Sequence, residues 1–382
     1  MDTDQRTANW AAFRAQLRAD RPYYLAILLY LDVATLVALI YDRDNGGPLL
    51  LIGHMLASIL AISVNMALVW LGLHALRTVR AGRSLRHGLW HSLDGEHLAR
   101  FLMVPALFVF LSAFNTIKVL LPDFTELNFD ATLSDLDRRL HGGDPWRMLA
   151  AFLGEDWQHL IQALYLPGWT YAVMLLTGYI CIAKRAQAVR GQYVTVFLVT
   201  WPLLGNVVAA LCLSDGPAFY GRITGDAERF GPLVEMLSRT RDNPFSAYML
   251  QNALWMLQQT QSATEGSGIS AFPSLHVAMA TLVCLGLASL NPRYALYGVP
   301  FLSGVFVGSI VLGWHYAVDG YASVILVCAL WFVVATLRKA VQARAVRPES
   351  VVGDAARVRR TRGVGYAAVS LDPPATTFVT RT

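Results

Sequence analysis

Charged residues are scarce in this sequence. Asp, Glu, Lys and Arg together make up 15% of its 382 residues, whereas hydrophobic residues make up 55%. Soluble domains carry about 25% charged residues, so this chain does not have the composition of one. The shortage of charge excludes an ordinary water-soluble fold and favours insertion into a membrane.

Cysteine is scarce as well, and its four positions do not suggest pairing. No Cys-x-x-C spacing occurs, so we expect small buried apolar residues rather than disulfides or metal ligands. The positions are Cys181, Cys212, Cys284 and Cys328. His87 and His91 have the spacing of one helix face, but they lie in a segment rich in arginine. We therefore expect neither a bound metal nor a cofactor.

Long apolar runs are what the sequence has instead. Most have about 20 residues, enough to cross a hydrocarbon core about 30 Å thick at a rise of 1.5 Å per residue. The eight runs are 23–41, 48–72, 98–121, 158–183, 192–213, 270–290, 294–313 and 317–337. The first run follows a polar stretch rich in arginine, and no small-residue cleavage site lies close behind it, unlike a cleavable signal peptide. The predicted fold is an all-α integral membrane protein with about eight transmembrane helices.

Lys and Arg are concentrated in alternate loops, and this distribution predicts an orientation. Basic loops stay in the cytoplasm. All five basic segments fall on one side of an eight-span arrangement: the N-terminal stretch, the loops after the second, fourth and sixth spans, and the tail. Both ends of the chain are therefore expected in the cytoplasm, with the protein in the plasma (inner) membrane. Basic and aromatic residues are not interleaved, so nucleic acid is not an expected partner.

The chain divides into three regions by composition. Residues 1–22 are expected to form a cytoplasmic interfacial segment, because Trp10, Phe13 and Leu17 recur at helical spacing. Residues 23–342 form the membrane domain, and 343–382 a disordered basic cytoplasmic tail. Two further amphipathic stretches, at 130–153 and 244–262, fall on the outer face. They either lie flat on the outer leaflet or shape an entrance for lipids.

Two short polar segments lie where apolar runs meet loops, both on the expected extracytoplasmic side. Ionisable residues at membrane depth are costly, so they indicate a functional site. The first segment is Pro273-Ser274-Leu275-His276, with Pro273 expected as the first residue of a helix. The N–H groups of a helix N-terminus attract anions, and the Ser274 hydroxyl adds a donor. His276 would give a proton to a leaving oxygen bound there; the alternative is a structural histidine.

The second segment, Gly313-Trp314-His315-Tyr316-Ala317-Val318-Asp319, carries a histidine and a carboxylate four residues apart. At the start of a helix this spacing places both on one face. A carboxylate that accepts from one ring nitrogen fixes the tautomer and leaves the other nitrogen as a nucleophile. His315 is therefore the expected nucleophile and Asp319 its orienting partner.

Together the two segments resemble the second and third motifs of the type-2 phosphatidic acid phosphatase superfamily. The resemblance is close over 265–325 and looser over about 115–325, which we take as the catalytic core. It implies a phosphohistidine formed on His315, protonation of the leaving group by His276, and no metal. Leu275 replaces the usual glycine of that family, and Gly308-Ser309 replace its Ser-Arg pair. These changes, with the Asp215–Tyr220 segment, are more similar to the inositol phosphorylceramide synthase branch.

Phosphoryl transfer relies on stabilisation of charge, so another cation should replace the missing arginine. Lys118 and Arg222 lie on the expected outer side, although Lys118 would otherwise snorkel and Arg222 would otherwise be a solvated loop residue. With Ser274 and Tyr220 they are the expected phosphate ligands. Asp130 and Asp137 are expected to be capping or surface residues.

The leading interpretation is a membrane lipid phosphotransferase that acts on a phosphorylated head group at the extracytoplasmic face. A phosphatase that hydrolyses phosphatidic acid-like or isoprenyl phosphates is the alternative within the same family. A transporter would place its ionisable residues near the bilayer midplane, whereas these lie at one surface. A non-catalytic membrane protein is the remaining alternative. The expected partners are membrane lipid substrates.

Overall fold

The computed structural model of the protein describes residues 3–41, 71–72, 75–76, 78–82, 94–125, 128–153, 157–243, 245–260 and 268–346. The predicted second span at 48–72, apart from its last two residues, and the predicted tail at 343–382, apart from its first four, lie outside these ranges. The chain forms two units, Met1–Val334 and Ala335–Thr382. Within the second unit, the described residues continue helix α18. Every regular element in the described ranges is helical.

Six helical segments of the described chain are long and apolar enough to cross a membrane. They comprise α1 (Thr3–Tyr41), α4 (Gly95–Phe101) with α5 (Met103–Val119), and α9 (Gln158–Ala163) with η1 (Leu164–Gly168) and α10 (Trp169–Ile182). The others are η2 (Lys184–Ala186) with α11 (Gln187–Pro202), η3 (Leu203–Val208) and α12 (Ala209–Leu211), then η4 (Pro292–Tyr294) with α17 (Ala295–Val311), and α18 (Ala317–Val346). A shorter apolar helix, α16, spans Leu275–Leu290. Apart from 48–72, each predicted span thus coincides with an apolar helix.

Helix α1 differs from its prediction. It runs without interruption from Thr3 to Tyr41 and has Pro22 inside it, so residues 3–22 continue directly into the first predicted span. A helix satisfies its own backbone hydrogen bonds on both sides of a membrane boundary, so a change of composition does not end it. Its Asp20 is buried and receives a hydrogen bond of 2.8 Å from Arg190 of α11. This pair joins the two helices.

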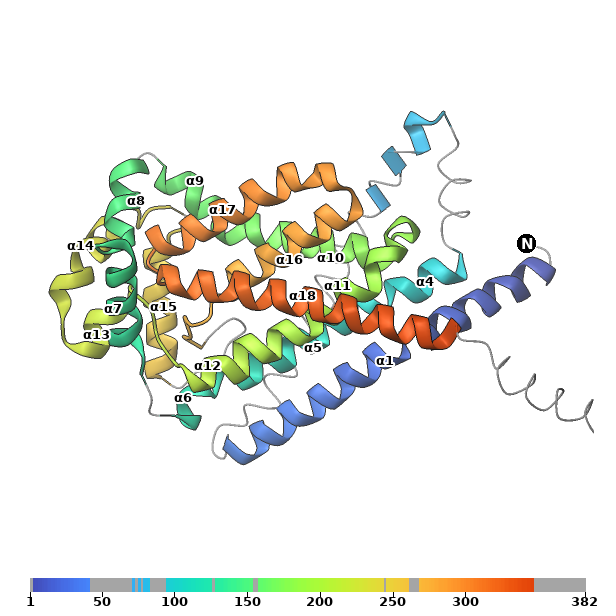
Figure 1. Ribbon diagram of the computed structural model, residues 1–382, viewed down its shortest axis with the longest axis horizontal. Coiled ribbons are helices and arrows are strands. Elements are labelled where there is room, and N and C mark those ends of the chain that lie inside the picture. Colours follow the sequence, from blue (N-terminus) through green and yellow to red (C-terminus); the bar gives the residue numbers. More distant parts are fainter. Residues whose placement is uncertain are drawn as a thin grey trace, which may run out of the picture. The chain divides into compact units, whose positions relative to one another are not determined.

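Short helices gather at one end of the bundle (Figure 1). They are α6 (Leu121–Phe124), α7 (Asp130–His141), α8 (Pro145–Leu153), α13 (Tyr220–Thr224), α14 (Ala227–Ser238) and α15 (Ala247–Gln259). The expected amphipathic stretch at 130–153 forms two helices, because Gly142 ends α7 with a left-handed φ of 73°. Arg229 of α14 binds Asp144 and the Ser134 carbonyl, which ties α14 to α7 and α8.

The two largest apolar clusters of the described residues form most of the interior. One lies between α5, α10, α11 and α16, with Phe110, Tyr193 and Met279 among its most buried side chains. The other joins α17 to the short helices, with Tyr165, Leu233 and Tyr316 at its centre. The loops that carry the polar motifs lie where the long helices meet the short ones.

Candidate active site

Three loops far apart in sequence are held together by backbone hydrogen bonds. Ala271 N donates to Ser214 O (2.7 Å), Ala218 N to Gly313 O (3.0 Å) and Ser274 N to Asp319 O (3.4 Å). Gly216 makes the contact possible: its φ is 94°, and a Cβ there would lie 2.6 Å from the Trp314 carbonyl oxygen. The loop 214–219 and the two polar motifs therefore form one unit.

Two buried aspartates of α7 bind backbone N–H groups of this unit. Asp130 accepts from the N–H groups of Asp215 (2.7 Å) and Gly216 (2.8 Å) and from the Tyr316 hydroxyl (2.7 Å). Asp137 accepts from Ala317 N (2.7 Å) and Val318 N (2.9 Å), the first N–H groups of α18. The predicted capping role is correct for Asp137, whereas Asp130 binds loop amides instead. A surface position is wrong for both residues, because both carboxylates are almost fully buried. Burial also raises the pKa of Asp137.

The His315 ring has one nitrogen fixed by the backbone. Its Nδ1 lies 2.8 Å from the Ala271 carbonyl oxygen and 3.4 Å from Asp319 Oδ2. A carbonyl oxygen only accepts, so Nδ1 carries the proton and donates to it. Nε2 is then left with a lone pair, which is the form a nucleophile needs. The carboxylate pairing expected from the spacing is present, but the backbone carbonyl is the nearer partner.

Asp319 is positioned to stabilise positive charge on His315. It is fully buried in the first turn of α18, and its Oδ2 accepts from Tyr316 N at 3.0 Å. Its Oδ1 has no hydrogen-bond partner among the described residues. A charged carboxylate 3.4 Å from Nδ1 favours the imidazolium that forms when Nε2 bonds to another atom.

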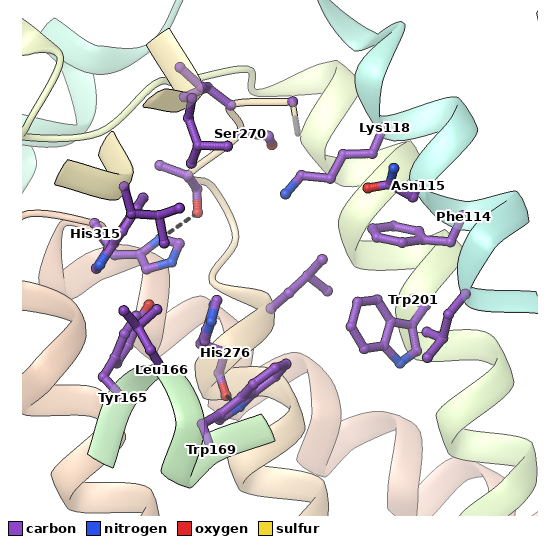
Figure 2. A pocket seen from close by; sticks show the side chains of 18 of the residues that line it. Phe114, Asn115, Lys118, Tyr165, Leu166, Trp169, Trp201, Ser270, His276 and His315 are labelled. Atoms are coloured by element: carbon purple, nitrogen blue, oxygen red, sulfur yellow. Dashed lines mark hydrogen bonds between the residues drawn. The ribbon is translucent and has the colours of Figure 1, made fainter. Parts of the chain in front are cut away.

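His276 lies in the first turn of α16, across from His315. Its ring stacks on Tyr165, with centroids 4.5 Å apart and planes at 15°, and lies 4.3 Å from the Trp169 ring. Trp169 Nε1 donates to the His276 carbonyl (2.9 Å), which fixes this turn against α10. The two histidine rings are 6.3 Å apart (Figure 2). That separation leaves space for a group bound between them.

Ser274 has a structural position rather than one at the cavity surface. It is fully buried, and its hydroxyl accepts from Val277 N at 3.3 Å as the N-cap of α16. Pro273 therefore precedes the cap. The prediction that Pro273 is the first helical residue is wrong. The helix starts at Leu275, so the His276 side chain emerges directly beside the cap.

A cavity of about 450 Å³ lies in front of the two histidines. Its lining is mostly apolar. Lys118, at the end of α5, points its ammonium group into the cavity from the side opposite His315 and His276 (Figure 2). Asn115 and Ser270 lie near it. The cavity thus brings two histidines and a lysine together inside a mostly apolar wall.

The other predicted phosphate ligands lie elsewhere. Arg222 donates to Asn252 Oδ1 (2.6 Å) and lies over the Trp255 ring. Tyr220 is buried against Phe230. Neither is part of the cavity lining. Of the four predicted ligands, the structure brings only Lys118 into the cavity with His276 and His315.

Asp215 is a cavity residue to which the sequence assigned no role. Burial, and to a smaller degree the neighbouring Asp130, raise its pKa to about 7. Asn128 Nδ2 donates to its Oδ2 at 3.3 Å. The signal available in the sequence was its place at the head of the Asp215–Tyr220 segment. Within the described ranges, no group of three His, Cys, Asp or Glu side chains is placed to hold a metal ion.

Comparisons with known proteins agree with this geometry. No curated protein and no solved structure matches the chain. A family model of the PAP2 superfamily matches residues 131–333, more than half of the sequence. The match contains both polar motifs, the loop 214–219 and Asp137, and members of this superfamily are phosphatases or phosphotransferases. The chain belongs to the PAP2 superfamily.

Proposed function

We propose that the protein is a lipid phosphotransferase similar to the inositol phosphorylceramide synthases, with His315 as its nucleophile. One observation supports this above the others: the Ala271 carbonyl holds the proton on His315 Nδ1. The lone pair on Nε2 is then available to the cavity that also contains His276 and Lys118. No other described histidine combines a fixed tautomer with a cavity of this size.

The reaction would proceed in two displacements. His315 Nε2 attacks the phosphorus of the donor lipid, and the bond from phosphorus to the leaving oxygen breaks while His276 gives that oxygen a proton. An acceptor hydroxyl then attacks the phosphorus, its proton passes to His276, and the P–N bond breaks. Asp319 stabilises the positive charge that His315 carries while Nε2 is bonded to phosphorus, and the Lys118 ammonium neutralises the phosphate oxygens.

The position of the missing arginine supports Lys118 as its replacement. Ser309 is buried, and its carbonyl accepts from Trp314 N and His315 N, both at 3.0 Å. This residue therefore shapes the turn before His315 and brings no charge. Lys118 reaches the same cavity from another helix. Lys118 therefore supplies to the cavity the positive charge that the arginine of the family's Ser-Arg pair would supply from the turn before His315.

The apolar wall favours a lipid acceptor over water. Leu275, which stands where the hydrolytic members have glycine, is part of the cavity lining with Trp169, Trp201 and Phe219. A phosphohistidine reacts with whichever hydroxyl the cavity positions, and an apolar surface positions a lipid alcohol better than water. Transfer is therefore expected to exceed hydrolysis.

The nucleophile is tested with purified protein and a lipid donor that carries a labelled phosphate. His315→Ala should abolish turnover and the trapped phosphoenzyme while the protein stays folded. His159→Ala is the matched control, because His159 binds Asn243 and does not line the cavity. Substantial turnover in the His315 variant would remove this mechanism.

The reaction type is tested with the same donor in the presence and absence of ceramide or diacylglycerol. Transfer predicts a phosphorylated acceptor, with a corresponding fall in free phosphate. Release of free phosphate from phosphatidic acid that no added alcohol changes would leave a phosphatase in its place.

A further inference from the structure

A second cavity of about 120 Å³ opens beside the first, between α5, α10 and α11. The two share lining residues, namely Phe108, Leu111, Trp169, Met174 and Trp201. The second cavity has almost no polar surface. Its two hydroxyls are occupied within the protein: Thr170 binds Leu166 O (2.9 Å) and Thr177 binds the Tyr193 hydroxyl (2.9 Å). It is therefore an apolar extension of the candidate active site.

All three helices indicate that this extension runs away from the histidines. On α5, which ends near Lys118, the residues that line only the second cavity come earlier, at Val104 and Leu107. On α10, which begins near His276, they come later and reach Gly178. On α11, Phe197 precedes the shared Trp201 by one turn. The second cavity thus lies deeper in the bundle than the candidate active site.

Its length matches one leaflet of a bilayer. Trp169 and Gly178 of α10 are nine residues apart, or about 13 Å at a rise of 1.5 Å per residue. Half of a hydrocarbon core about 30 Å thick is about 15 Å. The walls are protein on all three sides, since Leu107, Val173 and Phe197 are buried. The space therefore suits a single hydrocarbon chain rather than bulk lipid.

The junction of the two cavities offers one unused hydrogen-bond donor. Trp169 and Trp201 both line the junction, but Trp169 Nε1 already donates to the His276 carbonyl. Trp201 Nε1 is buried and has no partner among the described residues. A buried donor without an acceptor is costly, so an occupant with a carbonyl oxygen would be favoured there. Acyl lipids have an ester or amide carbonyl at the head of each chain, whereas isoprenyl phosphates have none.

We propose that the second cavity binds one acyl chain of the lipid substrate, with the Trp201 indole N–H donating to the carbonyl of that chain. This inference rests on the proposed function, because it places the phosphate of the same lipid between His276 and His315. It adds a substrate class: an acyl lipid whose chain length is selected between α5, α10 and α11.

Chain selection is tested with purified protein and donors that differ in acyl-chain length. Val173→Phe places a ring in the second cavity and should lower kcat/KM for long chains by about tenfold relative to short ones, equivalent to about 1.4 kcal/mol. Leu107→Ala enlarges the cavity and should shift the preference toward longer chains. Leu175→Phe is the matched control, since it lies on the exposed face of the same helix. Retention of the wild-type chain-length profile by both cavity variants would overturn the chain site.

The carbonyl contact is tested with Trp201→Phe, which keeps the aromatic ring and removes the N–H. Wild-type protein should prefer an ester-linked donor to its ether analogue, and the variant should lose that preference. An equal preference in both proteins would overturn the acyl assignment. Failure of the wild-type protein to act on any lipid phosphate would instead contradict the proposed function, so the two failures are distinguishable.

Discussion

At the scale of single residues, the His315 ring shows how a backbone atom can take a role expected of a side chain. The His-x-x-x-Asp spacing pointed to Asp319 as the group that fixes the tautomer. In the structure the Ala271 carbonyl accepts the Nδ1 proton at 2.8 Å, and Asp319 lies at 3.4 Å. In the proposed mechanism the two roles are thus divided: the carbonyl fixes the proton, and the carboxylate stabilises the charge that develops.

Asp319→Asn tests this division. The variant removes the negative charge but leaves the Ala271 carbonyl in place, so His315 should keep its reactive tautomer. We expect kcat to fall by about 10²-fold, less than the roughly 10⁴-fold loss seen where a carboxylate alone sets the tautomer. Rapid-quench measurement of phosphoenzyme formation provides the test. A wild-type rate of formation would show that the charge is not used.

Asp215 predicts a dependence on pH. Its pKa of about 7 exceeds the ordinary value because the carboxyl is buried beside Asp130. The group is neutral below about pH 7 and an anion above it, where it would repel a phosphate in the same cavity. KM for an anionic phosphodiester donor should therefore rise as pH increases through 7. Asp215→Asn should abolish that rise, and a rise that persists in the variant would assign it to another group.

The same raised pKa affects stability with a defined sign. Between the ordinary pKa of 3.8 and about 7, the folded protein holds a proton that the unfolded chain releases. The contribution of this group to folding therefore decreases as pH rises across that range and is constant above it. Asp215→Asn should flatten the pH dependence of thermal unfolding between pH 4 and pH 7.

At the scale of elements, α18 begins with a cap that comes from another helix. Asp137 of α7 accepts from its first two N–H groups, and Asp319 lies in the turn that this cap holds. Asp137→Ala should displace the turn and lower kcat by about 100-fold, because small misplacements of reacting groups have effects of that size. Asn retains one acceptor oxygen and should restore part of the rate.

The control for this prediction is Glu235→Ala, which removes a carboxylate of α14 that is 75% exposed. Kinetics and thermal unfolding should be measured on all three variants. If Asp137→Ala lowers the unfolding temperature but leaves kcat unchanged, the cap is structural only.

Most elements could be predicted from composition, because an apolar run of about 20 residues has few stable alternatives in a membrane. The predicted runs at 294–313 and 317–337 match α17 and the start of α18 closely. The ends of the helices were harder to predict from the sequence. The first turns of α1 are polar, so the apolar run did not reveal where this helix starts. Helix α16 starts two residues after the predicted position, because its N-cap is Ser274 and not the residue before Pro273.

The side chains that line the candidate site could largely be predicted from the sequence, whereas its backbone contacts could not. His276, His315 and Lys118 were named from their positions at the ends of apolar runs, and the structure places all three around one cavity. The Ala271 carbonyl could not be named, since every residue has one and only the fold selects it. The hydrogen bonds from distant backbone N–H groups to Asp130 and Asp137 could not be predicted for the same reason. Arg222 has the right charge, but Asn252 and Trp255 hold it away from the cavity lining.

At the scale of the whole molecule, the distribution of arginine predicts which side of the membrane holds the site. In a cysteine-free background, Ile223→Cys, at a partly exposed position on α13, should react with an impermeant thiol reagent added to intact cells. Arg293→Cys lies in the turn at the other end of α16 and should react only after permeabilisation. The reverse pattern would place the chemistry in the cytoplasm.

The Asp137 cap also has a consequence for biosynthesis. The carboxylate and the two amides that it binds are 180 and 181 residues apart in the chain, and α7 is translated long before α18. A ribosome that has completed α17 has delivered both α7 and His276, but it has not yet delivered His315 or the turn that Asp137 holds. Nascent chains arrested before α18 should therefore be inserted yet inert. In the proposed mechanism, the chain therefore acquires its nucleophile only after α17 and the helices before it have been synthesised.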